Sequence, residues 1–137
     1  MLEKYYGYKS NYKNAIILIK VGSFYECLDN DALIINKLFH YKIKRLKNNL
    51  KVGFPVNNIN MILSKLKLCN INYIVVENEI TDIYKSDDNQ YEIYQCDKEK
   101  VLFRFVQLER IIDTLESCII SDSIDEKLEK MNQVIGF

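Results

Sequence analysis

The chain of 137 residues is long enough for one domain with a modest core, and its 48% apolar content excludes wholesale disorder. The formal net charge is zero, yet residues 1–70 carry twelve Lys/Arg against four Asp/Glu, and residues 71–137 carry seven against fifteen. The basic half therefore either meets an anionic partner or attracts the acidic half of the same chain.

Four scattered cysteines and a single histidine argue against disulfide bonds and against a metal site. No C-x-x-C spacing occurs, so we expect reduced, mostly buried thiols in a cytoplasmic protein, and no metal site. The polar N-terminus does not resemble a signal peptide, and the run AIILI is too short to span a membrane. Phosphate-binding and dinucleotide-binding glycine motifs are absent, no motif surrounds His40, and no nuclease pattern stands out among the C-terminal carboxylates. We therefore expect no enzyme activity, no catalytic residue and no cofactor, and a metal-dependent nuclease built from scattered acids is the enzyme alternative left open.

The N-terminal segment predicts a short helix followed by two strands. Residues 3–14 are polar and aromatic, and a helix there is weakened by Gly7. Residues 15–21 are continuously apolar and β-branched, which is typical of a strand covered on both faces. Residues 24–28 continue as a second strand after Gly22, so the two strands predict a hairpin or a bulged bend.

Two helices, a second hairpin and a buried strand are predicted next. Residues 29–41 have helical spacing with Asp29 as the expected N-cap, and residues 42–55 predict a hairpin that turns at Asn48-Asn49. Residues 56–70 predict a helix that Asn57 or Asn58 caps, that buries one face, and that ends at a left-handed Asn70; the expected face comprises Ile59, Ile62, Leu63 and Leu66. Residues 71–78 predict a buried strand.

The C-terminal part predicts further strands and then helices. Short runs over 79–86, 90–97 and 101–108 are separated by polar turns, which favours two or three antiparallel strands. Residues 107–120 and 121–137 are amphipathic and predict helices. We therefore predict an α/β fold with a mixed sheet flanked by helices over residues 1–106, and a helical extension packed on it over 107–137.

The stretch VGSFYECL raises a question about exposed side chains. Alternation along a strand places Phe24 and Glu26 on one face, and a carboxylate is rarely buried without a partner. An exposed ring beside a carboxylate can wedge between stacked bases and accept a hydrogen bond from a base edge. The pattern alone favours the other interpretation, an edge-strand Phe24 packed under a helix beside a solvated Glu26.

A family resemblance reverses that preference. IKVGSFYECLDNDA resembles the start of the mismatch-recognition domain of the MutS mismatch repair family, and KVGFP followed by MILSKLKLCNINYIVVEN resembles the segments that come after it. The resemblance covers about residues 1–80. The matching residues are Lys20, Gly22, Phe24, Tyr25, Glu26, Asp31 and Ala32, then Val52, Gly53, Pro55, Leu63, Lys65, Leu66, Val75 and Glu77.

The resemblance implies a MutS domain I-like fold and roles for three residues. Phe24 would stack on a mispaired or unpaired base, and Glu26 would hydrogen-bond to that base. Lys20 matches an arginine of the family and would approach phosphate. A basic cluster could bind either a nucleic-acid backbone or an acidic partner; it comprises Lys42, Lys44, Arg45, Lys47 and Lys51. An alternative interpretation of equal weight is that these charges protect strand edges from aggregation.

The sequence also departs from the family pattern. Ser23 replaces an aspartate, Val56-Asn57 replace a Tyr-His pair, and Asn70 replaces a glycine. No segment resembles the connector, lever, clamp or ATPase domains, so we expect a stand-alone reader that binds duplex weakly. Small proteins that resemble this domain accompany reverse transcriptases of diversity-generating retroelements. The expected partners are mismatched or distorted DNA, or RNA–DNA hybrid, with a reverse transcriptase or repair protein.

A protein–protein interaction module is the alternative function. In that interpretation the fold is kept, Phe24 is a docking anchor, and the C-terminal helices bind a partner or a second copy. The supporting observation is an apolar stripe on the last helix, which comprises Ile124, Leu128, Met131 and Ile135. Such a stripe is also typical of an ordinary core.

Overall fold

The computed structural model describes residues 2–119 and 123–135, with side chains described except at 123, 134 and 135. Ile135, which belongs to the predicted apolar stripe, therefore has a side chain outside the described set. The chain divides into two compact units, residues 1–99 and residues 100–137. The domain boundary predicted at 106/107 stays a prediction.

The first unit is a mixed α/β layer structure, as predicted. Its helices are α1 (Leu2–Asn11), α2 (Asp29–Phe39), α3 (Ile59–Leu68) and α4 (Tyr91–Tyr94), with a 3-10 turn at Val56–Asn58. Its strands are β1 (Ile16–Val21), β2 (Phe24–Leu28), β3 (Lys44–Arg45), β4 (Leu50–Pro55), β5 (Tyr73–Val76) and β6 (Ile80–Tyr84). They form one sheet in the order β3-β4-β2-β1-β5-β6, in which only β1 and β5 are parallel neighbours.

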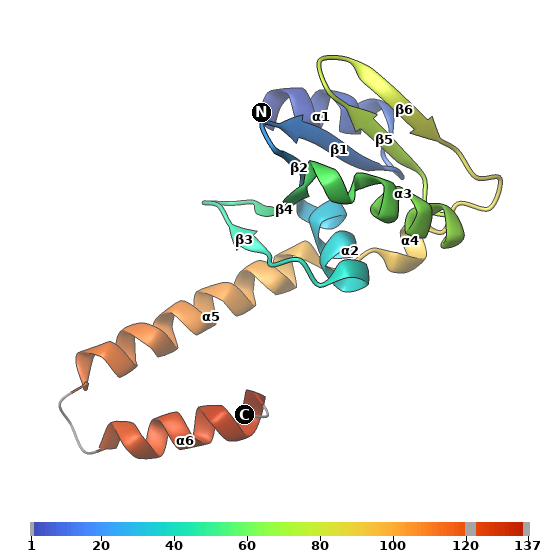
Figure 1. The fold of residues 1–137 in the computed structure, drawn as a ribbon. Helices are drawn as coiled ribbons and strands as arrows, with labels where there is room; N and C mark the ends of the chain where they lie inside the picture. The colour runs from blue at the N-terminus through green and yellow to red at the C-terminus, as the bar shows by residue number, and fades with distance from the viewer. Residues whose placement is uncertain (1, 120–122, 136–137) are drawn as a thin grey trace. The chain divides into compact units, whose positions relative to one another are not determined.

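Helices cover both faces of this sheet. α1 lies on one face, and α2 and α3 lie on the other (Figure 1). The central strands β1 and β5 are accordingly apolar on both sides, and residues 16–19 of β1 are at most 3% exposed. The core therefore sits at the middle of the sheet, and the ends of the strands are left for other contacts.

Most elements predicted for the first eighty residues are confirmed. The two hairpins and the buried strand β5 lie where the sequence places them. In α3, Ile62 and Leu66 are buried while Ile59 and Leu63 pack against the core, and Asn70 has a left-handed φ of 56°. These elements are governed by local periodicity and turn residues, which a sequence displays directly.

Asp29 is not the N-cap of α2. The residue at that position is Leu28, and Asp29 has a φ of 54°. Its carboxylate instead accepts a hydrogen bond from the backbone N of Leu50 at 3.1 Å and pairs with Lys98 Nζ at 3.3 Å. No side chain caps α2, and the Asp29 carboxylate makes tertiary contacts in place of a local cap.

The N-cap prediction for α3 is right in position and wrong in mechanism. Asn58 is the residue at that position, but its side chain makes no capping hydrogen bond. Its amide instead donates to the hydroxyl of Tyr41 at 2.9 Å. Asn58 therefore ties the start of α3 to the segment that follows α2.

Two of the three strands predicted after residue 80 are wrong. Residues 80–84 form β6, but residues 90–97 contain α4, and residues 101–108 belong to α5 (Lys98–Ser117). The alternation of bulky apolar residues in VLFRFV mimics a strand. Val101 and Phe105 also fit helical spacing, and the helix predicted at residue 107 extends back through them, since helices propagate more easily than they nucleate.

The second unit contains most of α5 and all of α6 (Ser123–Ile135), so the predicted C-terminal helices are confirmed. Its cysteine, Cys118, is half-buried. In the first unit Cys27 is buried, whereas Cys69 and Cys96 are half-buried, so the prediction of mostly buried thiols holds for Cys27 alone.

Two features are absent from the described part of the chain. None of its helices is long and apolar enough to cross a membrane. Over the same residues, no group of three or more His, Cys, Asp or Glu side chains is arranged to hold a metal ion.

Candidate nucleic-acid interface

A tight turn presents Phe24 at one end of the sheet. Gly22 has a φ of 61° and Ser23 does not have a positive φ, which is the pattern of a two-residue type II′ hairpin turn with glycine in first place. The carbonyl of Ser23 accepts a hydrogen bond from the backbone N of Val56 at 3.0 Å. The turn is therefore fixed to β4, and so is the start of β2.

Three apolar side chains form a row across this end of the sheet. Val21 pairs with Phe24, and Phe24 pairs with Pro55, so all three lie on one face of three adjacent strands. Val21 is 43% exposed and Phe24 is 48% exposed, and Pro55 is exposed too. An exposed ring between two apolar neighbours is not the packed edge residue that the sequence pattern alone favours.

Glu26 lies on the same face and is held by an ion pair. Its Oε2 is 3.0 Å from Nζ of Lys51, and the two side chains are 16% and 23% exposed. Residues two apart on a strand are separated by about 7 Å. On this face of β2, Glu26 is therefore the next side chain after Phe24. Its charge is balanced by Lys51 of β4.

An open hollow adjoins this ion pair. Glu26 and Lys51 line it together with Leu2, Glu3 and Leu46. The start of α1 therefore borders the carboxylate on the face that carries Phe24.

The predicted basic cluster divides between the two faces of the β3–β4 hairpin. Lys44 pairs with Lys51, so both lie on the face of Phe24 and Glu26. Lys42 and Lys47 are exposed at either end of β3. Arg45 pairs with Leu50 on the opposite face and is half-buried.

Lys20 is turned away from this group. It pairs with Tyr25, whose side chain lies on the other face, and its Nζ is 4.0 Å from Oε1 of Glu77. The Tyr25 hydroxyl donates to the same carboxylate oxygen at 3.1 Å, and burial together with this contact raises the pKa of Tyr25. The structure therefore groups Phe24, Glu26 and Lys51, and it places Lys20 across the sheet from them.

A buried carboxylate, Asp31, is hydrogen-bonded to α1, β1 and α4 and so holds these elements together. Asp31 is 1% exposed and accepts hydrogen bonds from the Ile17 backbone N at 3.1 Å, from Tyr91 Oη at 2.6 Å and from Tyr5 Oη. Lys9 Nζ lies 2.7 Å from its Oδ1. Burial and the Asp31 charge both raise the pKa of Tyr91 and of Tyr5, so both hydroxyls stay protonated as donors.

The family model described as MutS domain I matches residues 1–103. The chain belongs to the MutS domain I family. The match extends beyond the resemblance seen over residues 1–80 and includes β6, α4 and the first residues of α5. The predicted family and the predicted fold are both confirmed.

Full-length MutS proteins resemble the N-terminal half of this chain. The DNA mismatch repair protein MutS of Thermosipho melanesiensis is 36% identical over 66 residues, which are 48% of this chain and 8% of that protein. The corresponding values are 35% over 66 residues for Pseudothermotoga lettingae and 32% over 68 residues for Borreliella burgdorferi. This chain spans less than a tenth of the length of these relatives.

Sequence reasoning missed part of the candidate site in this MutS domain I unit. Val21 could have been found from the hairpin, because a two-residue turn places it opposite Phe24. Pro55 and the pairing of Lys51 with Glu26 could not, because they depend on how β4 aligns beside β2. That register is a long-range property of the sheet.

Proposed function

We propose that the MutS domain I unit of this chain senses mispaired or distorted nucleic-acid duplexes. The observation that carries this proposal is the exposed Phe24, which directly follows a two-residue turn and lies between Val21 and Pro55. A half-exposed aromatic ring flanked by apolar side chains is a wedge that fits between stacked bases. Mispaired and unpaired bases are less costly to unstack, so a wedge prefers them.

Glu26 gives the wedge a polar contact. In this proposal its carboxylate accepts a hydrogen bond from a donor on the base that stacks against Phe24. The 3.0 Å ion pair with Lys51 offsets the carboxylate charge, which reduces its repulsion from the phosphates on either side. Lys51 therefore positions Glu26 and makes its approach to a polyanion less costly.

Basic side chains supply the affinity that does not depend on sequence. We propose that Lys42, Lys44, Lys47 and Lys51 approach phosphates on the Phe24 side of the duplex, with Arg45 at the same hairpin. Lys20 is proposed as a weaker contact, since its side chain lies on the other face near Glu77. Contacts of this kind give dissociation constants of about 10⁻⁴–10⁻⁶ M for non-specific duplexes.

The same proposal extends to the setting in which such a sensor acts. We propose an accessory role without catalysis beside a mutagenic reverse transcriptase or a repair protein, in the cytoplasm. The product of an error-prone polymerase is a duplex with mismatches, either DNA or RNA–DNA hybrid, and a mispair sensor has a use there.

Wild-type binding to matched and defective duplexes tests the proposed function. We expect tighter binding to a duplex with one G·T mismatch or a one-base bulge than to the matched duplex, because wedging is less costly at the defect. Fluorescence anisotropy at low salt, with DNA and with RNA–DNA hybrid, measures the difference. Equal binding to all the duplexes would contradict mispair sensing and would leave only a basic surface.

The basic hairpin gives a second expected result. Replacing Lys42, Lys44 and Lys47 with glutamine should flatten the dependence of log K on log salt by up to about one unit per lysine. The matched control replaces Lys65, Lys67 and Lys85, which are equally exposed and lie outside this hairpin. An equal change in the control would show that the salt dependence of binding reflects the net charge of the protein and not the position of these lysines.

An interaction module that keeps the MutS domain I fold is the second candidate. The exposed row of Val21, Phe24 and Pro55 fits this function as well, because an apolar patch with a polar rim is typical of protein docking. The two functions differ in their response to nucleic acid. A protein that binds none of the duplexes above at any salt concentration would favour the interaction module.

A further inference from the structure

The second unit fully buries almost none of its apolar side chains. Among its described side chains only Ile124 is buried, at 8% exposure. By contrast, Leu108 is 48% exposed, Ile112 is 47% exposed and Leu128 is 42% exposed. Two helices that bury so little apolar surface do not stay folded together in water. Another apolar surface is therefore needed to cover this hairpin.

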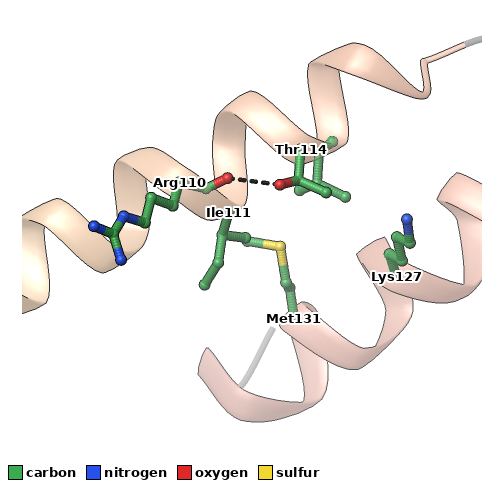
Figure 2. A pocket seen from close by; sticks show the side chains of 6 residues that line it. Arg110, Ile111, Thr114, Lys127 and Met131 are labelled. Atoms are coloured by element: carbon green, nitrogen blue, oxygen red, sulfur yellow. Dashed lines mark hydrogen bonds between the residues drawn. The ribbon is translucent and has the colours of Figure 1, made fainter.

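α6 covers only one side of α5. Figure 2 shows Ile111 of α5 and Met131 of α6 pointing toward one another, with Lys127 on the same side. The hollow between the helices is lined from α5 by Arg110, Ile111, Thr114 and Leu115. Leu108 and Ile112 are not part of this lining, so their face of α5 is turned elsewhere.

The face of α5 that carries Leu108 and Ile112 belongs to a heptad repeat, whose first two members are half-buried and whose last member, Leu115, also lines the hollow toward α6. The apolar residues of the repeat follow one another at intervals of four, three, four and three, and they are Val101, Phe105, Leu108, Ile112 and Leu115. This spacing has an average period of 3.5 residues, which is typical of helices that pack side by side at a shallow angle. Another helix with the same period would cover this row of side chains.

The repeat is self-complementary when a second copy runs antiparallel. The intervals between Phe105, Leu108, Ile112 and Leu115 are three, four and three, which read the same in both directions. In an antiparallel pair, Phe105 would lie opposite the partner's Leu115. Leu108 would lie opposite the partner's Ile112, so every layer of the contact is apolar.

The charges of α5 favour the same arrangement. Residues 98–107 carry three cations and one anion, whereas residues 108–117 carry three anions and one cation. This distribution opposes the helix dipole, which favours anions at the N-terminus and cations at the C-terminus. An antiparallel copy places the basic half of one helix beside the acidic half of the other, which turns the unfavourable pattern into attraction.

We propose that two copies of this chain associate through antiparallel α5 helices. Each copy contributes α5 and α6, so the contact is a four-helix bundle with two-fold symmetry, in which the same surface of each chain meets itself. The partner that covers the exposed face of Leu108 and Ile112 is then a second copy of the chain.

Light scattering on the full chain, with a matched pair of variants, tests this association. The wild type should have twice the mass of one chain, and Leu108→Lys combined with Ile112→Lys should have the mass of one, because four ammonium groups would meet in an apolar seam. Phe103→Lys is the control, since Phe103 is 60% exposed on α5 but outside the repeat, and it should remain a dimer. A monomeric wild type, or a dimer that survives the double substitution, would overturn the proposal.

Two measurements keep the test decisive if the double variant loses its helices. The midpoint of thermal loss of the wild-type helical signal should rise with protein concentration, because dimer association is coupled to folding. Mixed Leu108→Cys and Ile112→Cys chains should form a disulfide between these positions, identified by mass spectrometry, whereas in either variant alone the two introduced cysteines should not link to each other. A midpoint independent of concentration, or a disulfide between two copies of the same introduced cysteine, would contradict the antiparallel dimer.

Discussion

Phe24→Ala is expected to abolish the preference for mispaired duplexes while leaving the fold intact. Removing an aromatic platform on which a base stacks costs about 1–3 kcal/mol per base, which corresponds to about 5–150-fold in affinity for the defective duplex. Binding to the matched duplex, which depends on phosphate contacts, should change little. Because the Phe24 side chain is 48% exposed, its loss should alter the free energy of unfolding by no more than about 0.5 kcal/mol.

Anisotropy titrations of the wild type and the variant on matched, G·T and bulged duplexes measure this effect. Ile83→Ala is the matched control, since Ile83 is 43% exposed and pairs with Ile74, on the same face of the sheet but at its far edge strand. It should leave discrimination unchanged. If Phe24→Ala discriminates as well as the wild type, Phe24 is not the wedge, and the interaction-module alternative gains support.

Asp31→Ala is expected to destabilise the first unit by about 3–5 kcal/mol, the usual cost of leaving a buried charge without its partner. The substitution removes the carboxylate partner of the Lys9 ammonium, which keeps the Ala15 carbonyl as an acceptor, and it removes an acceptor of the hydroxyls of Tyr5 and Tyr91. It also leaves the backbone N of Ile17 without its acceptor in the middle of the sheet. Since small domains are stable by about 5–15 kcal/mol, this loss is a large fraction of the total.

Urea unfolding followed by tyrosine fluorescence measures this loss. All ten tyrosines lie within residues 1–99, so the signal reports on the first unit alone. Asp31→Asn keeps the volume and one acceptor oxygen but removes the charge, and it should cost less than Asp31→Ala. Lys9→Met combined with Asp31→Leu removes both charges and should recover the part of the stability that the unpaired ammonium costs, but not the part lost with the acceptor of Ile17 N and of the two tyrosine hydroxyls. A change below about 1 kcal/mol in Asp31→Ala would show that the network does not anchor the sheet.

The two predictions separate the roles of neighbouring motif residues. Phe24 and Asp31 lie seven positions apart in the same family motif, yet Phe24 is exposed at a turn after β1 and Asp31 is buried beside the start of β1. Loss of Phe24 should affect binding without affecting folding. Loss of Asp31 should affect folding first, and binding only through it.

The sequence by itself determined the elements of the first eighty residues and the shared face of Phe24 and Glu26. These features depend on local rules, namely the alternation of a strand, the period of a helix and the turn preferences of glycine and asparagine. The MutS resemblance rests on the same segments, because its motifs are short and continuous. Such features can be predicted without knowing which residues lie beside them in the folded protein.

The tertiary structure alone decided the remaining features of the site. Lys51 reaches Glu26 because β4 pairs with β2 in one register, and Asp31 gathers Tyr5, Lys9 and Tyr91 from segments up to 60 residues away. The helical state of residues 101–108 was likewise decided by extension of α5 and not by the local alternation of VLFRFV. Each outcome depends on groups distant in sequence, where the free energy of pairing and burial outweighs local preference.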